Sequence, residues 1–277
     1  MSQVDNWEEF QRTAALPDED IDLARTALLI AALEHPDLDL EQQLVALDSL
    51  AAAAFRRIGP DRQPLTSVNA LSDYLFDEVG FRGNQEDYYD PRNSYLNQVL
   101  ARRVGIPITL TLLCIEVGKR VGVPLMAIGM PGHLLVRHRD EPDLFIDPFY
   151  GGILLSQDEC AQRLREIAGA NLPWDSSYLA PISNREFIAR MLRNLKGIYL
   201  QQQDYQRALP IMHRLVVIRP EVRYERRDRG MVLYQLGQYH EALEDLQWYL
   251  ASGAADQDSR PVERLVARIQ GLLPGES

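Results

Sequence analysis

The chain has 277 residues, of which 46% are hydrophobic and 25% charged, and it carries a formal net charge of −11. This composition is typical of a folded globular protein. The acidic excess argues against nucleic acid as the main partner, because phosphate binding needs surplus Lys and Arg. The start of the chain shows no basic and apolar leader, and no apolar run reaches the roughly 18 residues that cross a bilayer. We therefore expect a cytoplasmic protein that does not enter a membrane, and the oligomeric state stays open.

The first part of the chain is predicted to be helical. Residues 18–33, 40–58 and 67–79 each carry apolar side chains at helical spacing. A loop rich in Gly, Asn and Asp follows at residues 80–93. The pattern predicts a helical segment over 1–82 that packs on the domain after it.

The next segment predicts a short helix followed by a buried one. Asn93 or Ser94 is a suitable N-cap for a helix that runs to Arg103. Gly105 then breaks the chain, and residues 108–121 are apolar on most sides. A helix that is apolar all round belongs inside the core rather than at the surface.

Alternating apolar and polar residues after this helix predict strands. One strand carries His133, and the next, after a turn centred on Glu141, ends at Asp147. In the antiparallel register that this turn sets, Leu135 faces Asp147 and His133 faces Phe149. His133 and Asp147 are then diagonal neighbours within reach of an imidazole–carboxylate hydrogen bond. A register shifted by one pair would place them opposite each other and would permit the same bond.

The last part of the chain contains a repeat. Residues 193–209 and 227–243 align at an offset of 34, with Ala208 and Ala242 at the same place in each copy. A helix–turn–helix unit of 34 residues, with a small residue where the paired helices touch, is typical of the tetratricopeptide repeat. Two such units are too few to bury a core by themselves.

Together these patterns predict a mainly helical protein of the α+β class. We predict an N-terminal helical segment over 1–82, a core over 83–170, a linker over 171–184 and a repeat region over 185–277.

Five strings of residues resemble the SirB-type family, in which a transglutaminase-like core precedes tetratricopeptide repeats. They are GFRGN at 80–84, YYDPRNSYLNQVL at 88–100, RRVGIPITL at 102–110, PGHLLVR at 131–137 and FIDPFYGG at 145–152. The resemblance covers nearly the whole chain. It implies a buried helix against a small antiparallel sheet, followed by helical hairpins.

The resemblance also implies where a site would lie. In active transglutaminase-like enzymes a Cys opens the core helix, a His lies on the next strand and an Asp on the strand after it. His133 and Asp147 match the His and the Asp. By analogy the Cys position falls between Pro107 and Thr109, where this chain has no sulfur. Cys114 lies deeper in the helix, where the helix dipole does not activate it.

Two functions are compatible with a site of this kind. The first is a non-catalytic, regulatory protein whose repeat region binds a protein or peptide partner. The alternative is a hydrolase or acyltransferase in which Thr109 or a bound water replaces the thiol, with His133 as the base and Asp147 orienting it. We favour the first function and do not expect an enzyme.

Four further residues are candidates for the lining of the cleft. They are Asn84, Asn93, Ser94 and Pro107. Turn and cap chemistry is the other explanation for Asn and Ser at such places.

Neither cysteines nor histidines predict a metal site, and we expect no cofactor. Cys114 and Cys160 show no metal or disulfide spacing and are expected to be buried apolar side chains. His133 and His138 point to opposite faces of a strand, so they cannot share a metal ion there.

Overall fold

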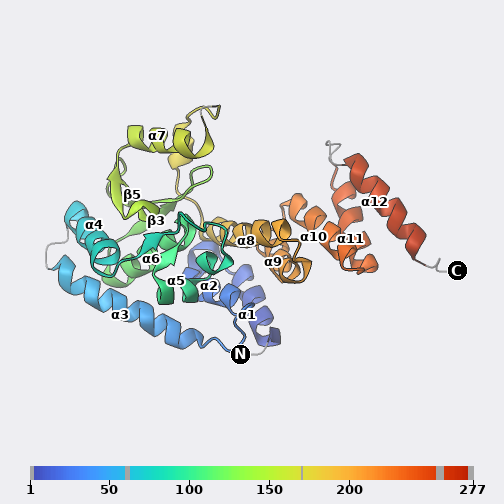
Figure 1. Cartoon of the computed structure of the whole chain (residues 1–277), viewed down its shortest axis with the longest axis horizontal. Helices are drawn as coiled ribbons and strands as arrows, with labels where there is room; N and C mark the ends of the chain where they lie inside the picture. The colour runs from blue at the N-terminus through green and yellow to red at the C-terminus, as the bar shows by residue number, and fades with distance from the viewer. Residues whose placement is uncertain (1–2, 60–62, 170, 254–258, 274–277) are drawn as a thin grey trace. The chain divides into compact units, whose positions relative to one another are not determined.

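A computed structural model of the chain describes residues 3–59, 63–169, 171–253 and 259–273 (Figure 1). The backbone divides into two units, one that ends at Met191 and one that begins at Leu192. No helix in these four ranges combines the length and apolarity that a membrane span requires.

Four helices form the N-terminal segment of the first unit. They are α1 (Gln3–Ala15), α2 (Leu23–Ala31), α3 (Leu40–Ile58) and α4 (Pro64–Ser72). The side chains of Asp22 and Asp39 accept the N–H groups of Arg25 and Gln42, which starts α2 and α3. The helix predicted over 40–58 is confirmed. The one predicted over 18–33 shortens to α2, because its first residues form a 3-10 turn.

The buried helix is α6 (Pro107–Val121), and its predicted position is confirmed. Leu110, Leu112 and Leu113 are fully buried, and Gly122 ends the helix in the left-handed conformation. The preceding helix is α5 (Leu96–Arg102), which Tyr95 precedes without a side-chain cap. The prediction that Asn93 or Ser94 caps it was wrong, because the two residues lie in a separate 3-10 turn over Pro91–Ser94.

Four antiparallel strands form the sheet in the order β3-β4-β5-β6. They are β3 (Leu125–Ile128), β4 (Leu135–His138), β5 (Phe145–Asp147) and β6 (Ile153–Leu155). Val136 pairs with Ile146, which confirms the register predicted from the turn at Glu141. Two short strands, β1 (Arg82–Gly83) and β2 (Val104–Gly105), pair in parallel before α6.

Helices cover the sheet on both faces. Helix α6 packs against β3 and β4, and α7 (Gln157–Ala168) lies on the far side (Figure 1). On that side Cys160 of α7 joins a hydrophobic cluster with Leu135 and Phe145. The result is the predicted α+β fold, mainly helical, with a core helix against a small antiparallel sheet.

The second unit confirms the repeat. Helix α8 (Asn184–Gln201) runs across the division of the chain, and α9 (Tyr205–Ile218), α10 (Arg223–Gln235), α11 (Tyr239–Ala251) and α12 (Ser259–Leu272) follow. The turn between α8 and α9 and the turn between α10 and α11 are 34 residues apart, as predicted. Ala208 and Ala242 are fully buried where their helices meet.

Two adjacent glycines offer a matched test of the packing before β6. Both have positive φ, 77° for Gly151 and 73° for Gly152. A Cβ at Gly152 would overlap the Ser72 hydroxyl and the Phe76 ring, whereas one at Gly151 would meet no atom within 4 Å. We expect Gly152→Ala to cost about 3 kcal/mol of unfolding free energy and Gly151→Ala about 1 kcal/mol, measured by urea unfolding. Equal losses would contradict this close packing.

Candidate functional site

His133 and Asp147 form a buried pair. The imidazole Nε2 lies 3.0 Å from Oδ1 of Asp147, and the two residues are 3% and 0% exposed. Asp147 ends β5, but His133 lies two residues before β4, in a turn where its N–H donates to the carbonyl of Met130. The expectation that His133 belongs to a strand was therefore wrong, although the pairing that it predicted is present.

The carboxylate of Asp147 has three neighbours. Besides the imidazole, Oδ1 accepts the N–H of Phe149 at 3.2 Å. Oδ2 faces Nε of Arg163 at 3.4 Å without hydrogen-bond geometry. When the imidazole is neutral, the bond to Asp147 holds its proton on Nε2 and leaves Nδ1 as an acceptor. The geometry therefore fixes the orientation and tautomer of a potential base.

Arg163 is a part of the site that the sequence did not indicate. It comes from α7, and its guanidinium lies 3.9 Å from the centre of the Tyr150 ring and 3.0 Å from the carboxylate of Glu166. A guanidinium over an aromatic face is attracted by the ring as well as by the nearby anions. Arg163 thus supplies a positive charge beside Asp147 and holds Tyr150 in place.

Aromatic rings cover the imidazole. Phe149 and Tyr150 lie 6.2 and 6.1 Å from it, and Tyr88 contacts Phe149 edge-on at 6.0 Å. Tyr89 contacts Tyr88 and is 63% exposed. A row of rings therefore leads from the surface to His133, and the imidazole itself is closed off from solvent.

Thr109, the candidate replacement nucleophile, is also buried. Its Oγ1 accepts the N–H of Ile106 at 3.1 Å and donates to the carbonyl of Asn93 at 2.7 Å. The residue is fully buried in the first turn of α6, two positions after the buried Pro107. Both the donor and an acceptor site of the hydroxyl are thus taken by backbone groups.

The predicted cleft residues gather around Asn93. Asn84 donates to Oδ1 of Asn93 at 3.2 Å, and Asn93 donates to the carbonyl of Asp87 at 2.7 Å. Ser94 is buried, and its hydroxyl has no hydrogen-bond partner within the described ranges. These contacts hold the loop before α5 together, and the bond from Thr109 to the carbonyl of Asn93 ties that loop to the start of α6.

The predicted site residues therefore form two separate groups, one around Asn93 and one around His133 and Asp147. Within the part of the chain that the structure describes, no hydrogen bond joins the group around Asn93 to His133 or Asp147. Tyr88 links the two groups, because its carbonyl accepts from Asn93 at 3.3 Å while its ring packs on Phe149.

The two thiols are poor nucleophiles. Cys114 lies in the middle of α6 and Cys160 in α7, and both are buried. Burial raises the pKa of Cys114, and burial together with the charge of Asp147 raises the pKa of Cys160 to about 12. Among the residues that the structure describes, no three His, Cys, Asp or Glu side chains cluster as metal ligands would.

Comparison with known proteins shows the class of protein to which this chain belongs. Residues 41–193 match the model of the transglutaminase-like superfamily, and residues 195–267 match that of the tetratricopeptide repeat. The first match includes α3 and α4 as well as the core predicted over 83–170. A transglutaminase-like core followed by tetratricopeptide repeats thus defines the architecture.

Relatives that match most of the chain then identify the family. The chain is 39% identical over 245 residues to a UPF0162 protein of Xylella fastidiosa, with 86% of each chain covered. It is 31% identical over 240 residues to a UPF0162 protein of Vibrio cholerae, with 85% of this chain and 88% of that one covered. The chain belongs to the UPF0162 family.

The similarity also reaches a longer protein. F-box only protein 21 of Mus musculus is 31% identical over 151 residues, which are 50% of this chain and 23% of that protein. No solved structure matches the chain.

Asp147→Ala tests whether the buried pair stabilises the fold. The change leaves His133 and the N–H of Phe149 without their acceptor and removes the negative charge beside Arg163, and we expect a loss of about 3 kcal/mol in unfolding free energy. Asp143→Ala is the matched control, because that carboxylate is exposed and accepts a surface hydrogen bond from Gln157. The control should lose less than about 0.5 kcal/mol. Urea unfolding measures both, and a small loss in both variants would contradict a structural role for Asp147.

Proposed function

We propose that this protein is a non-catalytic binding protein of the regulatory kind, on a transglutaminase-like core that has lost its nucleophile. The observation that carries the proposal is the state of the Thr109 hydroxyl. By analogy with active transglutaminase-like enzymes it lies in the turn where their cysteine would stand, and it is bonded to the backbone of Ile106 and Asn93.

A hydroxyl nucleophile needs a base within hydrogen-bond reach and an open path to the substrate. Thr109 has neither, because its hydrogen-bond partners are backbone groups and it is 0% exposed. The pair of His133 and Asp147 instead supports the fold by joining the turn before β4 to the end of β5.

The alternative function, a hydrolase or acyltransferase, would have to use a bound water in place of Thr109. One observation favours it: Nδ1 of His133 has no hydrogen-bond partner within the described ranges, so the imidazole keeps a free basic nitrogen. The cover of Phe149 and Tyr150 opposes it, because a substrate carbonyl would have to displace both rings.

The partner would bind through the repeats, a class of structure that presents extended surfaces to other proteins. Tyr224 and Met231 are large apolar residues of α10 that are 42% and 36% exposed. They are seven residues apart and so lie on the same face of the helix. Exposed aromatic and Met side chains are typical anchors of protein interfaces.

An activity panel separates the two functions. We expect wild-type protein and His133→Ala to hydrolyse amide and ester substrates at the same rate as buffer, since no activated nucleophile is present. Turnover by the wild type that disappears in His133→Ala would overturn the non-catalytic proposal.

Thiol labelling tests the two cysteines. With a pKa of about 12, Cys160 is ionised to about one part in ten thousand at pH 8. We expect iodoacetamide to modify Cys114 and Cys160 only as fast as the chain unfolds, and rapidly in guanidinium. Because the folded-state pKa is raised, stability should fall as the pH rises from about 8.5 towards 12. Rapid modification of the native protein would reveal a reactive thiolate and contradict the proposal.

Two double variants test the repeat surface. Tyr224→Ala with Met231→Ala should lower the recovery of a bound partner at least tenfold, because truncating an aromatic anchor costs about 2 kcal/mol. Val45→Ala with Leu65→Ala removes exposed apolar side chains of the first unit and is the control. Quantitative affinity purification from cell extract, with thermal melting as the folding check, compares them. Equal recovery in both would remove the repeats as the binding surface.

A further inference from the structure

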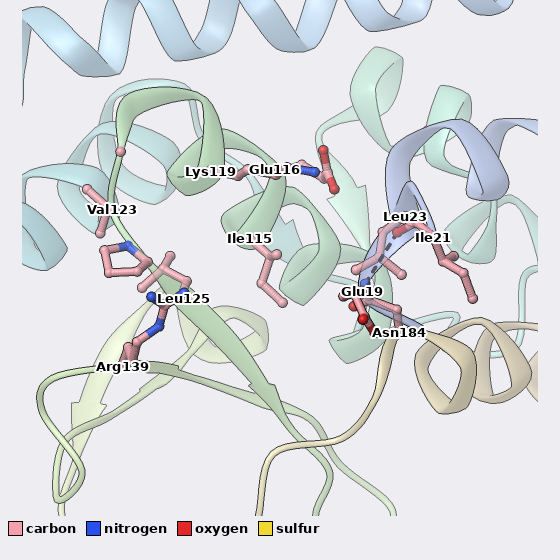
Figure 2. Close-up of a pocket in the computed structure, with 12 residues that line it drawn as sticks. Glu19, Ile21, Leu23, Ile115, Glu116, Lys119, Val123, Leu125, Arg139 and Asn184 are labelled. Atoms are coloured by element: carbon pink, nitrogen blue, oxygen red, sulfur yellow. Dashed lines mark hydrogen bonds between the residues drawn. The ribbon is translucent and has the colours of Figure 1, made fainter. Parts of the chain in front are cut away.

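A second candidate site lies in the first unit, away from His133. A pocket of about 420 Å³ opens between the end of α6 and the start of β3 (Figure 2). Its volume is within the range of about 300–1,000 Å³ that ligand pockets occupy. Arg139 and Leu125 stand on one side, Glu19 and Asn184 on the other, and Ile115 between them (Figure 2).

At this pocket, the outer edge of β3 is not paired with another strand of the described chain. β3 is an edge strand, and only its β4 side is paired along its whole length. The N–H of Arg139 donates to the carbonyl of Pro124, so the backbone at residue 124 points its carbonyl toward β4. In an antiparallel ladder these groups alternate in direction. The N–H and C=O of Leu125 therefore point away from β4, toward the pocket that Leu125 lines.

The chain itself shows that this edge accepts an extended segment. Pro181 forms an antiparallel bridge with Ile128, and the N–H of Ile182 donates to the carbonyl of Ala127 at 3.0 Å. The chain then turns into α8 at Asn184. The segment that pairs with β3 ends there. Leu125 is the next outward-facing residue of β3, and no strand of the described part of the chain pairs with it on that side.

The charges around the edge favour an acidic partner. Lys119 and Arg139 line the pocket, are exposed and have no ion-pair partner within the described ranges. Glu116 also lines it, but its carboxylate is paired with Arg120 at 2.5 Å. Glu19 stands on the opposite side, where it would repel a second acidic group (Figure 2). The electrostatic potential is therefore positive on the side of the pocket near Leu125 and negative on the opposite side.

We propose that this pocket binds an extended segment of a partner protein, which adds a short strand to β3 at Leu125. One residue of the segment exchanges two backbone hydrogen bonds with Leu125, as in other cases of strand addition. An acidic side chain of the segment meets Lys119 and Arg139, and an apolar side chain packs on Ile115. This site does not involve the repeats or His133, so it stands apart from the proposed function.

Selection from a random octapeptide phage library against the full chain tests the proposal. We expect enriched peptides with alternating apolar residues and an acidic residue near the middle. These peptides should bind the double variant Lys119→Glu, Arg139→Glu at least tenfold more weakly than they bind the wild-type protein. The control is Arg82→Glu with Arg165→Glu, which makes the same change of charge at exposed positions of the same unit. No enrichment, or equal binding to both double variants, would overturn the proposal.

A backbone test then distinguishes strand addition from charge attraction alone. The enriched peptide is synthesised with a single N-methyl group at each position in turn. Because only alternate N–H groups of a strand face its neighbour, methylation at the residue opposite Leu125 should reduce binding at least tenfold, while methylation at its two neighbours should not. A uniform effect along the peptide would contradict pairing with β3. Neither outcome depends on the repeat variants, so failure here leaves the proposed function untouched.

Discussion

The burial of the first half of α6, from Pro107 to Cys114, constrains the rest of the first unit. A helix that begins inside a protein needs internal partners for its first N–H groups and for the backbone around them. Thr109 provides them at the start of α6 by bonding the N–H of Ile106 and the carbonyl of Asn93. The same contacts withdraw the hydroxyl from chemistry. The packing that anchors the core helix and the absence of a free nucleophile thus have one cause.

Asp147 shows how a catalytic geometry can persist for structural reasons. A carboxylate without solvent is tolerated only where hydrogen bonds and opposite charge replace water. His133, the N–H of Phe149 and the charge of Arg163 supply that replacement. Once these groups surround the carboxylate, removing any of them weakens the compensation for a buried charge, whether or not the site ever turns over a substrate.

The sequence predicted the fold where local pattern and tertiary packing agree. The bounds of α3, the bounds of α6 and the period of the repeats all follow from spacing of apolar residues. The strand register followed from the turn at Glu141. The cap of α5 and the strand assignment of His133 failed, because the Asn93 side chain is bonded to the loop before it and His133 to Asp147.

Only some residues of the candidate site could be predicted from the sequence. His133 and Asp147 are recognisable from their place after the core helix. Arg163 is not, because a helix with several charged residues gives no sign of which one will face a buried carboxylate. The closing of the site by Phe149 and Tyr150 is equally a product of packing, since both rings follow Asp147 in a turn whose direction no local pattern fixes.

The aromatic cover has a spectroscopic consequence. The His133 ring lies edge-on to Phe149, at an interplanar angle of 86°, and is tilted against Tyr150. Circulating electrons in those rings shift the magnetic resonance of protons held beside them. The carbon-bound protons of this imidazole should therefore resonate apart from those of the other four histidines in the chain. That separation would let one ionisable side chain be followed individually in a protein of 31.6 kDa.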